Sequence, residues 1–215
     1  MLKTFSISLV LLSSFLSPNP GNDWRLRENK DGIQVYSKSV PGSGVDAVKS
    51  VYNVNSSVSG VVALVADAAS YPKWIYRCSQ AKTLKTISQE EFIYYQETSV
   101  PWPASNRDLI GHVKISQDPN TKIATITAEN MPTFIPEKSG KVRLKVFHEK
   151  IDIVPKGKDK SEVTYELFLD PGGNIPAWMV NLAIVDGPFE SSRDMIKLIN
   201  TGAYKNVHLS FIKDL

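Results

Sequence analysis

An arginine set among apolar residues is the most chemically specific feature of this sequence. A rigid stretch at 101–106, Pro-Trp-Pro-Ala-Ser-Asn, leads into Arg107-Asp-Leu-Ile-Gly-His-Val-Lys-Ile. Side chains of a strand alternate between its two faces, so Arg107 shares a face with the apolar positions Leu109, Gly111, Val113 and Ile115. A guanidinium keeps its proton, and burying it without a partner is very costly. Either a carboxylate meets Arg107, or the apolar side is a cavity that holds a polar ligand end or water.

Two carboxylates on the preceding predicted strand are candidates for this partner. Glu91, Tyr95 and Glu97 alternate along that strand and therefore share one face, which puts both acids in range of Arg107 by parity. Such a pair can hold the polar end of a ligand, or it can satisfy only itself inside the fold. Both interpretations stay open.

Other residue types that support catalysis are sparse. The sequence contains no HExxH motif, nucleophile elbow or phosphate-binding glycine loop. His112, His148 and His208 are spread along the chain, and His112 faces away from Arg107 by parity. Cys78 is the only cysteine, which excludes an internal disulfide, and a lone thiol is typically a small buried hydrophobe. We therefore expect no cofactor and no metal.

Composition indicates one globular domain. The chain has 215 residues, 42% of them hydrophobic, and a formal net charge of +3. This length fits a single domain of about 190 residues after any processing. No Lys/Arg run is dense enough for a nucleic-acid face, because the basic cluster at 156–160 is interrupted by Gly and Asp and reads as a solvated turn.

The first 21 residues resemble a secretory signal peptide. Lys3 precedes an apolar stretch of about a dozen residues, which is shorter than the ~20 residues that span a bilayer. No Ala-x-Ala site follows, so the cleavage point between Ser17 and Gly21 is poorly defined. We expect an exported protein, periplasmic or secreted, or else a soluble domain with a retained N-terminal membrane anchor.

Turn signals divide the rest of the chain into strands framed by two helices. Ser57 is the expected N-cap of the first helix, and Gly187-Pro188 is expected to kink the last one. The predicted elements are a helical turn around Trp24, strands at 33–38 and 47–54, a helix after 57, strands at 78–87, 91–99, 107–116, 121–129, 142–153 and 161–169, and a helix at 175–204. This order predicts an α+β fold in which a long antiparallel sheet curls around the C-terminal helix.

Four spaced motifs resemble a known family, the START domain (steroidogenic acute regulatory protein-related lipid-transfer domain). The motifs are Trp24 with Asp-Gly-Ile-Gln-Val-Tyr at 31–36, Tyr-Pro-Lys-Trp at 71–74, the stretch 101–108, and Asp-Pro-Gly-Gly-Asn-Ile-Pro-Ala-Trp at 170–178 followed by Asn181. The resemblance covers about residues 22–206 and leaves 207–215 as a tail. It implies a helix-grip fold that encloses a hydrophobic tunnel and binds one sterol, fatty acid or other lipid for transfer or sensing, without catalysis.

The resemblance also assigns roles to individual positions. The family's buried basic residue falls on Arg107, and its acidic partner falls most naturally on Glu91. The C-terminal helix and the loop before the arginine strand would form a gate that makes transient contact with a membrane surface. The expected ligand-binding residues are Arg107, Glu91, Glu97, Tyr95, Leu109, Trp102, Trp178, Leu182 and Val185.

One departure concerns the lipid. The phosphatidylcholine-transfer branch holds its headgroup with an Arg and an Asp at positions that are Tyr71 and Ile75 here. The missing clamp disfavours phosphatidylcholine and favours a sterol, fatty acid, isoprenoid or another weakly polar lipid.

Several tryptophans have two interpretations. Trp102 either contacts the membrane or gate, since indoles favour the bilayer interface, or it packs against the C-terminal helix. Trp178 either lines the tunnel or belongs to the core, and Trp24 and Trp74 are expected in the core.

Two other classes of function remain alternatives. Helix-grip folds also host enzymes of the cyclase/aromatase type, which act on a hydrophobic small molecule in the same cavity. A scaffold protein would keep the fold but fill the cavity, and the small Gly111 on the inward face argues against that.

Overall fold

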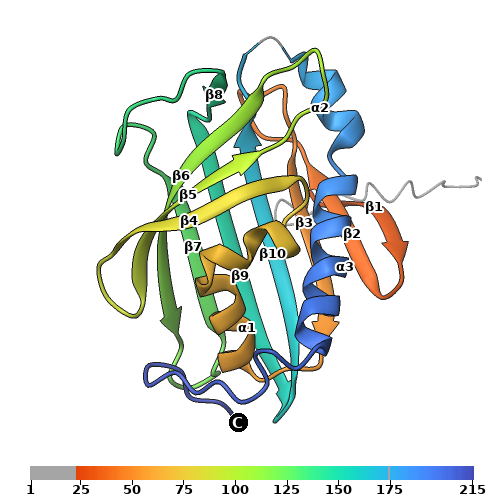
Figure 1. The fold of residues 1–215 in the computed structure, drawn as a ribbon. Helices are drawn as coiled ribbons and strands as arrows, with labels where there is room; N and C mark the ends of the chain where they lie inside the picture. The colour runs from red at the N-terminus through yellow and green to blue at the C-terminus, as the bar shows by residue number, and fades with distance from the viewer. Residues whose placement is uncertain (1–22, 174) are drawn as a thin grey trace, which may run out of the picture.

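The molecule is one large antiparallel sheet curled around helices (Figure 1). The computed structural model describes residues 23–173 and 175–215. The strands are β1 (Arg25–Lys30), β2 (Ile33–Lys38), β3 (Ala47–Val54), β4 (Cys78–Thr86), β5 (Glu91–Thr98), β6 (Asn106–Gln117), β7 (Ala124–Asn130), β8 (Lys141–Arg143), β9 (Val146–Gly157) and β10 (Lys160–Asp170). The helices are α1 (Val58–Ala66), the 3-10 helix η1 (Ala68–Lys73), α2 (Ala177–Ala183) and α3 (Asp186–Asn200).

The strand order brings distant parts of the chain together. The sheet runs β1-β2-β3-β10-β9-β7-β6-β5-β4, and the short β8 pairs in parallel with β6. Because β3 lies beside β10, the first three strands join the sheet next to its last strand. The sheet thereby curls into a trough whose concave side faces α1 and α3 (Figure 1).

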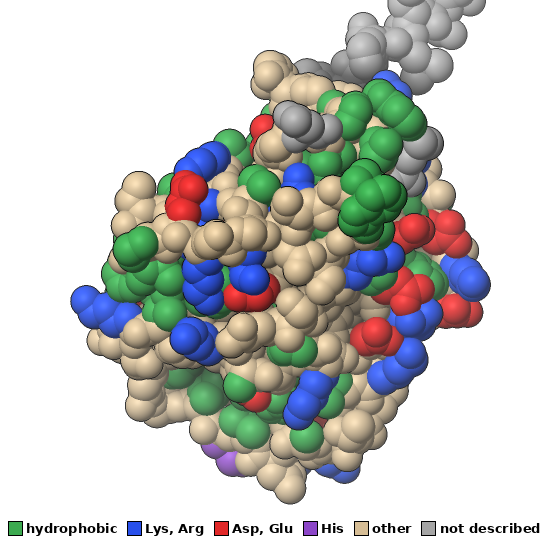
Figure 2. All heavy atoms as spheres, turned by 45° about the horizontal axis from the view of Figure 1, so that its top comes forward, with side chains coloured by type: hydrophobic (Ala, Val, Ile, Leu, Met, Phe, Trp, Pro, Cys, Tyr) green, Lys and Arg blue, Asp and Glu red, His purple; other side chains and the backbone are tan. Residues whose placement is uncertain are grey.

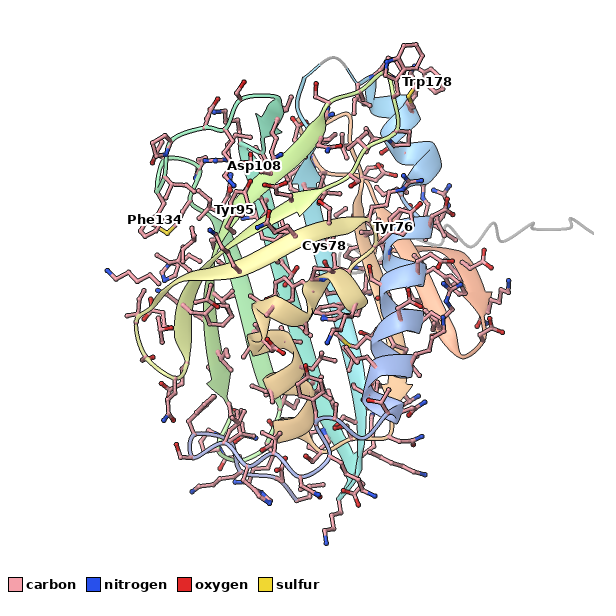
Figure 3. The ribbon with its side chains drawn as sticks, viewed as in Figure 1. Tyr76, Cys78, Tyr95, Asp108, Phe134 and Trp178 are labelled. Carbon is pink, nitrogen blue, oxygen red and sulfur yellow. The ribbon has the colours of Figure 1, made fainter. Side chains whose placement is uncertain are left out.

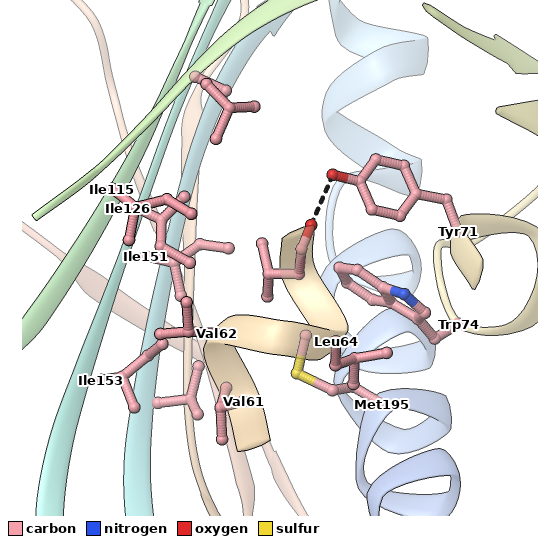
Figure 4. Packing of buried hydrophobic residues seen from close by; sticks show 14 of the residues in the cluster. Val61, Val62, Leu64, Tyr71, Trp74, Ile115, Ile126, Ile151, Ile153 and Met195 are labelled. Atoms are coloured by element: carbon pink, nitrogen blue, oxygen red, sulfur yellow. Dashed lines mark hydrogen bonds between the residues drawn. The ribbon is translucent and has the colours of Figure 1, made fainter. Parts of the chain in front are cut away.

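The lower part of this trough is a well-packed core (Figure 4). Ser57 caps α1, its side chain accepting a hydrogen bond from the Gly60 backbone N–H at 3.2 Å, as its sequence position predicts. The hydroxyl of Tyr71 donates to the Val65 carbonyl at 2.8 Å and fastens η1 to α1. Apolar side chains from the helices and the sheet meet here: Val61, Val62, Leu64, Trp74, Ile115, Ile126, Ile151, Ile153 and Met195.

A second, smaller apolar cluster lies on the convex side of the sheet. Ile93, Tyr95 and Ile110 are buried there, and Met131 and Ile135 of the segment after β7 pack against them. Strands β5 and β6 are therefore buried on both faces near these residues.

The predicted helix-grip fold is confirmed, with corrections in detail. The turn around Trp24 is wrong, because residues 25–30 form β1. Trp24 is also not in the core: its ring lies under the ammonium groups of Lys38 and Lys49, at 4.9 and 4.6 Å. Trp74 is buried as predicted.

Two predicted elements are each divided in two. The strand expected at 142–153 is broken between Arg143 and Val146 into β8 and β9. The C-terminal helix breaks at Ile184–Val185, before the expected Gly187-Pro188 kink. Pro188 falls in the first turn of α3, where the backbone nitrogen has no intrahelical acceptor to lose, so the helix passes through it.

No helix among residues 23–173 and 175–215 has the length and apolar character needed to cross a bilayer. The predicted signal peptide at 1–21 lies outside the described residues.

Candidate functional site

Arg107 meets neither of its predicted partners. Its side chain points to the concave side and is only 4% exposed, and its guanidinium donates to backbone carbonyls. Nε lies 3.1 Å from the Pro171 oxygen, Nη2 lies 3.0 Å from the Gly172 oxygen, and Nη1 donates to Ser105. Desolvation alone lowers the pKa of Arg107. Arg107 therefore ties the loop before β6 to the turn after β10, at the end of the trough where α2 begins.

Two glycines make this arrangement possible. Gly172 and Gly173 have φ values of +60° and +68°, a left-handed backbone that favours glycine. A Cβ atom at Gly173 would also lie 3.3 Å from Nη2 of Arg107. The Asp-Pro-Gly-Gly turn thus presents its carbonyls to the guanidinium at close range.

The predicted acidic partners of Arg107 lie on the other face of the sheet. In the β5–β6 register Arg107 is opposite Thr98, whereas Glu97 is opposite Asp108 and Glu91 is opposite Lys114. Residues opposite each other in an antiparallel pair share a face. The predicted Arg107–Glu91 pairing is therefore wrong.

On the convex face these residues have other partners. The carboxylate of Glu91 lies 2.6 Å from His112 Nε2, and that of Glu97 lies 3.0 Å from Lys141 Nζ. The Tyr95 hydroxyl donates to Glu97 at 2.6 Å. Glu91, Tyr95 and Glu97 could therefore contact a ligand only if it bound to the convex face of the sheet.

The buried ion pair of this region is one that the sequence reasoning missed. Asp108 and Arg143 pair on the convex side, and neither side chain is exposed. Asp108 lies near Tyr95, on the side of the sheet that carries Phe134 (Figure 3). Strand alternation predicts that Asp108 and Arg107 point to opposite faces of the sheet. Nothing in the sequence indicates that Asp108 pairs with Arg143, which is 35 residues away.

A second missed residue is an acid on the concave face. Glu149 of β9 lies between Phe147 and Ile151 in the alternation, and both of these are buried in the core. The hydroxyl of Tyr165 donates to Glu149 Oε2 at 3.0 Å. Desolvation raises the pKa of Glu149 to about 7. The parity argument that singled out Arg107 would also have found this residue.

The concave face is incompletely covered around Glu149. Glu149, Tyr165, Leu167 and Leu169 all lie on the concave face, yet they are only half-buried. In the core at the α1 end, by contrast, the inward residues are fully buried. These inward side chains of β9 and β10 are thus partly accessible in the part of the chain that the structure describes.

An open pocket adjoins this end of the trough. Its volume is about 720 Å³, within the usual range of roughly 300–1,000 Å³ for ligand pockets. The loop 40–45, Phe168, the turn 170–173 and the start of α2 line it. Asn181 of α2 is bonded to the same loop, with its side chain accepting from the Asp46 N–H at 3.1 Å and donating to the Gly44 oxygen at 2.9 Å.

Two predicted gate residues are exposed at this end. Trp102, in the loop before β6, is 92% exposed, so the alternative that it packs against the C-terminal helix is wrong. Trp178 of α2 is 62% exposed and projects away from the sheet (Figure 3), so it does not line the trough. Hydrophobic side chains gather near the α2 end, beside Lys and Arg side chains (Figure 2).

The remaining predicted site residues are placed as follows. Leu109 is buried on the concave face, and Val185 packs against the same core. Leu182 lies in α2, and its side chain is outside the described part of the structure. Of the predicted set, the structure therefore places Arg107, Leu109 and Val185 on the concave side of the sheet.

The three histidines lie outside the trough. His112 and His148 lie on the convex face, paired with Glu91 and Glu129, and His208 is exposed near the C-terminus. Burial raises the pKa of the Cys78 thiol to about 11, which leaves it protonated at neutral pH. No group of three or more potential metal ligands occurs among residues 23–173 and 175–215.

Comparisons with known proteins agree with this architecture. The START domain family model matches residues 20–201. An uncharacterized protein of Pseudomonas aeruginosa is 34% identical over 174 residues, which cover 80% of this chain and 85% of that protein. The phosphatidylcholine transfer protein of Rattus norvegicus is 32% identical over 186 residues, covering 82% and 84% of the two chains. The crystal structure of a STAR-related lipid transfer protein from Xanthomonas axonopodis superposes with a TM-score of 0.78 at 28% identity, covering 83% of this chain and 99% of that one. This chain is a member of the START domain family of lipid-binding proteins.

Proposed function

We propose that this protein binds a single weakly polar lipid between the concave face of its sheet and its C-terminal helices, for transfer or sensing and without catalysis. One observation carries the proposal: Tyr165, Leu167, Leu169 and Glu149 face inward but are only half-buried. Inward-facing apolar side chains that the protein leaves partly uncovered are the surface that a lipid tail would cover.

The energetics of tail burial are sufficient for this function. Burying a methylene contributes roughly 0.8 kcal/mol, so a 16-carbon chain offers on the order of 10 kcal/mol before entropy and desolvation are subtracted. The apolar wall alone can supply affinity, and the few polar groups in the trough are left to select the head.

The named relatives bear on the class of lipid. Some are phosphatidylcholine transfer proteins, but the residues here argue for a different head. At the two positions assigned to the phosphocholine clamp stand Tyr71 and Ile75, and the Tyr71 hydroxyl is engaged by the Val65 carbonyl. We propose a sterol or another weakly polar lipid rather than phosphatidylcholine.

The gate in this proposal is the α2 end of the trough. Arg107 holds the turn 171–172 on one side of α2, and Asn181 holds the loop 44–46 on the other. Exposed Trp102 and Trp178 would enter the interface of a membrane, which indoles favour, while these contacts loosen and a lipid passes.

A cyclase-type enzyme is the alternative in the same cavity. General acid–base catalysis needs a positioned acid and base beside the substrate. Among the described residues, Glu149 is a carboxylate on the concave face and the three histidines lie elsewhere, which favours binding over turnover.

The first test is native mass spectrometry of the purified protein, with organic extraction of any bound molecule. One hydrophobic ligand per chain would support the proposal and identify the lipid class. Failure to bind any of a panel of sterols, fatty acids and phospholipids would favour a scaffold protein, and conversion of the ligand would favour the enzyme.

We also propose that the protein is exported after removal of residues 1–21. Intact-mass spectrometry of the protein from its native host would give a chain shortened near Ser17–Gly21. A full-length chain in the membrane fraction would favour the retained anchor instead.

A further inference from the structure

An acid in the lipid trough gives the proposed function a chemical preference. Glu149 lies on the concave face of β9, with Leu167 of β10 and Ala128 of β7 as its cross-strand neighbours. Phe147 and Ile151 are its neighbours on the same face of β9. A carboxylate in such an apolar wall is costly unless something compensates it.

The described residues satisfy only part of the hydrogen-bonding capacity of the Glu149 carboxylate. Oε2 accepts the hydrogen bond from Tyr165, whereas Oε1 accepts none from the described residues. Within residues 23–173 and 175–215, no Lys, Arg or His nitrogen lies within 4.0 Å of the carboxylate, and its pKa responds to burial and to Tyr165 alone. One oxygen therefore remains available for a donor that the protein does not supply.

The ionisable groups whose pKa the Glu149 charge raises are neutral phenols: Tyr165 of β10, Tyr52 of β3, Tyr71 of η1 and Tyr94 of β5. The Cys78 thiol of β4 in turn raises the pKa of Tyr71 and Tyr94. Burial raises the pKa of each tyrosine, which keeps the hydroxyls protonated. The other charged group on this face, Arg107, is engaged by three backbone carbonyls.

We propose that Glu149, positioned by Tyr165, is the specificity-determining residue for the lipid head and selects a lipid that ends in a neutral hydroxyl group. The inference rests on the proposed function, because it needs a lipid in the trough. A hydroxyl donates to the free oxygen of the carboxylate and adds no charge to the apolar wall. A fatty acid carboxylate or a phosphate brought to the same place repels the ionised Glu149.

A cationic head is disfavoured by desolvation. An amine would pair with Glu149, but both charges would then lie in an apolar site whose described residues offer the pair one hydrogen bond, from Tyr165. The loss of hydration of two ions commonly exceeds their attraction under such conditions. The preference for a hydroxyl over an amine is therefore a separate part of the proposal and is tested separately.

Three probes with the same 16-carbon tail test the head group alone: 1-hexadecanol, hexadecanoic acid and hexadecylamine. Their competition for the full-length protein is measured by native mass spectrometry at pH 8.0 and pH 5.5. We expect the wild type to prefer hexadecanol over hexadecanoate by at least tenfold at pH 8.0. This preference should shrink at pH 5.5, where Glu149 is mostly protonated.

The central variant is Glu149→Gln, which keeps the size of the side chain and removes its charge. It should lower the preference for hexadecanol over hexadecanoate to below threefold at pH 8.0. The matched control is Glu166→Gln, which removes the same charge from the opposite face of neighbouring β10 and should leave the preference unchanged.

Tyr165→Phe provides an independent readout should Glu149→Gln fail to fold. The hydrogen bond from Tyr165 lowers the pKa of Glu149, so its removal should move the pH midpoint of hexadecanoate binding upward. A merely structural role of Tyr165 would weaken all three probes equally and leave the midpoint in place, which would overturn the proposal.

The outcomes separate the inference from the proposed function. If none of the probes, nor any lipid of the wider panel, binds the wild type, the proposed function itself fails. If they bind but Glu149→Gln keeps the wild-type preference, lipid binding stands and the role of Glu149 is overturned. A wild-type preference for hexadecylamine would overturn the hydroxyl assignment in favour of a cationic head.

Discussion

Arg143 forms a two-pronged ion pair with Asp108: Nε lies 2.8 Å from Oδ1 and Nη2 lies 2.9 Å from Oδ2, and neither side chain is exposed. The same guanidinium donates to the backbone oxygens of Pro132, Ile135 and Pro136, at 2.6, 3.2 and 3.3 Å. The pair thus fastens the segment 132–136 to the convex face of β6.

We expect Asp108→Ala to lower the free energy of unfolding by roughly 3–5 kcal/mol, because it leaves the Arg143 charge buried without a counter-ion. Urea denaturation measures this loss. The comparison is Glu137→Ala, which breaks an exposed pair with Lys145 and should cost less than about 1 kcal/mol. Equal losses in the two variants would contradict a dominant role for the buried pair.

Gly111→Ala should also destabilise the fold. A Cβ atom at Gly111 would lie 2.3 Å from the Tyr94 ring, so the small residue makes room for Tyr94 and not for a ligand. The small size of Gly111 was predicted to speak against a filled cavity; that prediction is wrong, because Tyr94 fills the space beside it. Overpacking of this kind costs about 1–3 kcal/mol, again measured by urea denaturation.

The control for Gly111 is Gly187→Ala in α3, where a Cβ atom would be in ordinary contact at 3.7 Å from Tyr76. Alanine favours a helix over glycine, so this variant should be unchanged or up to about 1 kcal/mol more stable. If Gly111→Ala behaves like Gly187→Ala, the Tyr94 ring has space to move that the structure does not indicate.

Arg107→Leu should loosen the α2 end of the trough. It removes the three hydrogen bonds that join Ser105, Pro171 and Gly172, and hydrogen exchange should accelerate in the segments 101–106 and 171–181 while the α1 core stays protected. Asn181→Ala, which frees the opposite side of α2, is the companion variant. If hydrogen exchange is unchanged in Arg107→Leu but the set of bound lipids differs from that of the wild type, Arg107 would instead contact the head of the ligand, as the sequence predicted.

Trp102→Ser and Trp178→Ser should each weaken association with phospholipid vesicles by roughly tenfold, since burying an indole surface is worth roughly 1–3 kcal/mol. Vesicle co-sedimentation measures this association. Leu26→Ser, at an exposed apolar residue of β1, is the control and should have little effect. A similar loss in all three variants would point to nonspecific adsorption.

The stability of the protein should fall as the pH rises from about 4.5 to about 7 relative to a Glu149→Gln variant. The pKa of Glu149 is raised from its ordinary value of 4.5 to about 7, so in this window the folded state holds a proton that the unfolded state has released. The difference should approach the order of 3 kcal/mol and level off above pH 7. Parallel stability curves of the two proteins would show that Glu149 is better solvated than the structure indicates.

The sequence alone determined the local features of this protein. Strand alternation correctly placed Arg107, Leu109, Val113 and Ile115 on one buried face, and Ser57 correctly marked the start of α1. These predictions hold because side-chain direction in a strand and capping of a helix depend on residues only a few positions apart. The spaced motifs were enough to identify the family and therefore the helix-grip fold.

Only the tertiary structure decided which groups meet. Arg107 has carbonyl partners 64 and 65 residues away, and its expected partner Glu91 lies on the opposite face because the β5–β6 register pairs Glu91 with Lys114. A shift of that register by one residue would exchange the faces, and strand parity does not specify the register. The sequence determined to which face of its own strand each side chain points. The order and register of the strands depend on contacts between distant segments, and they decided which partner each side chain contacts.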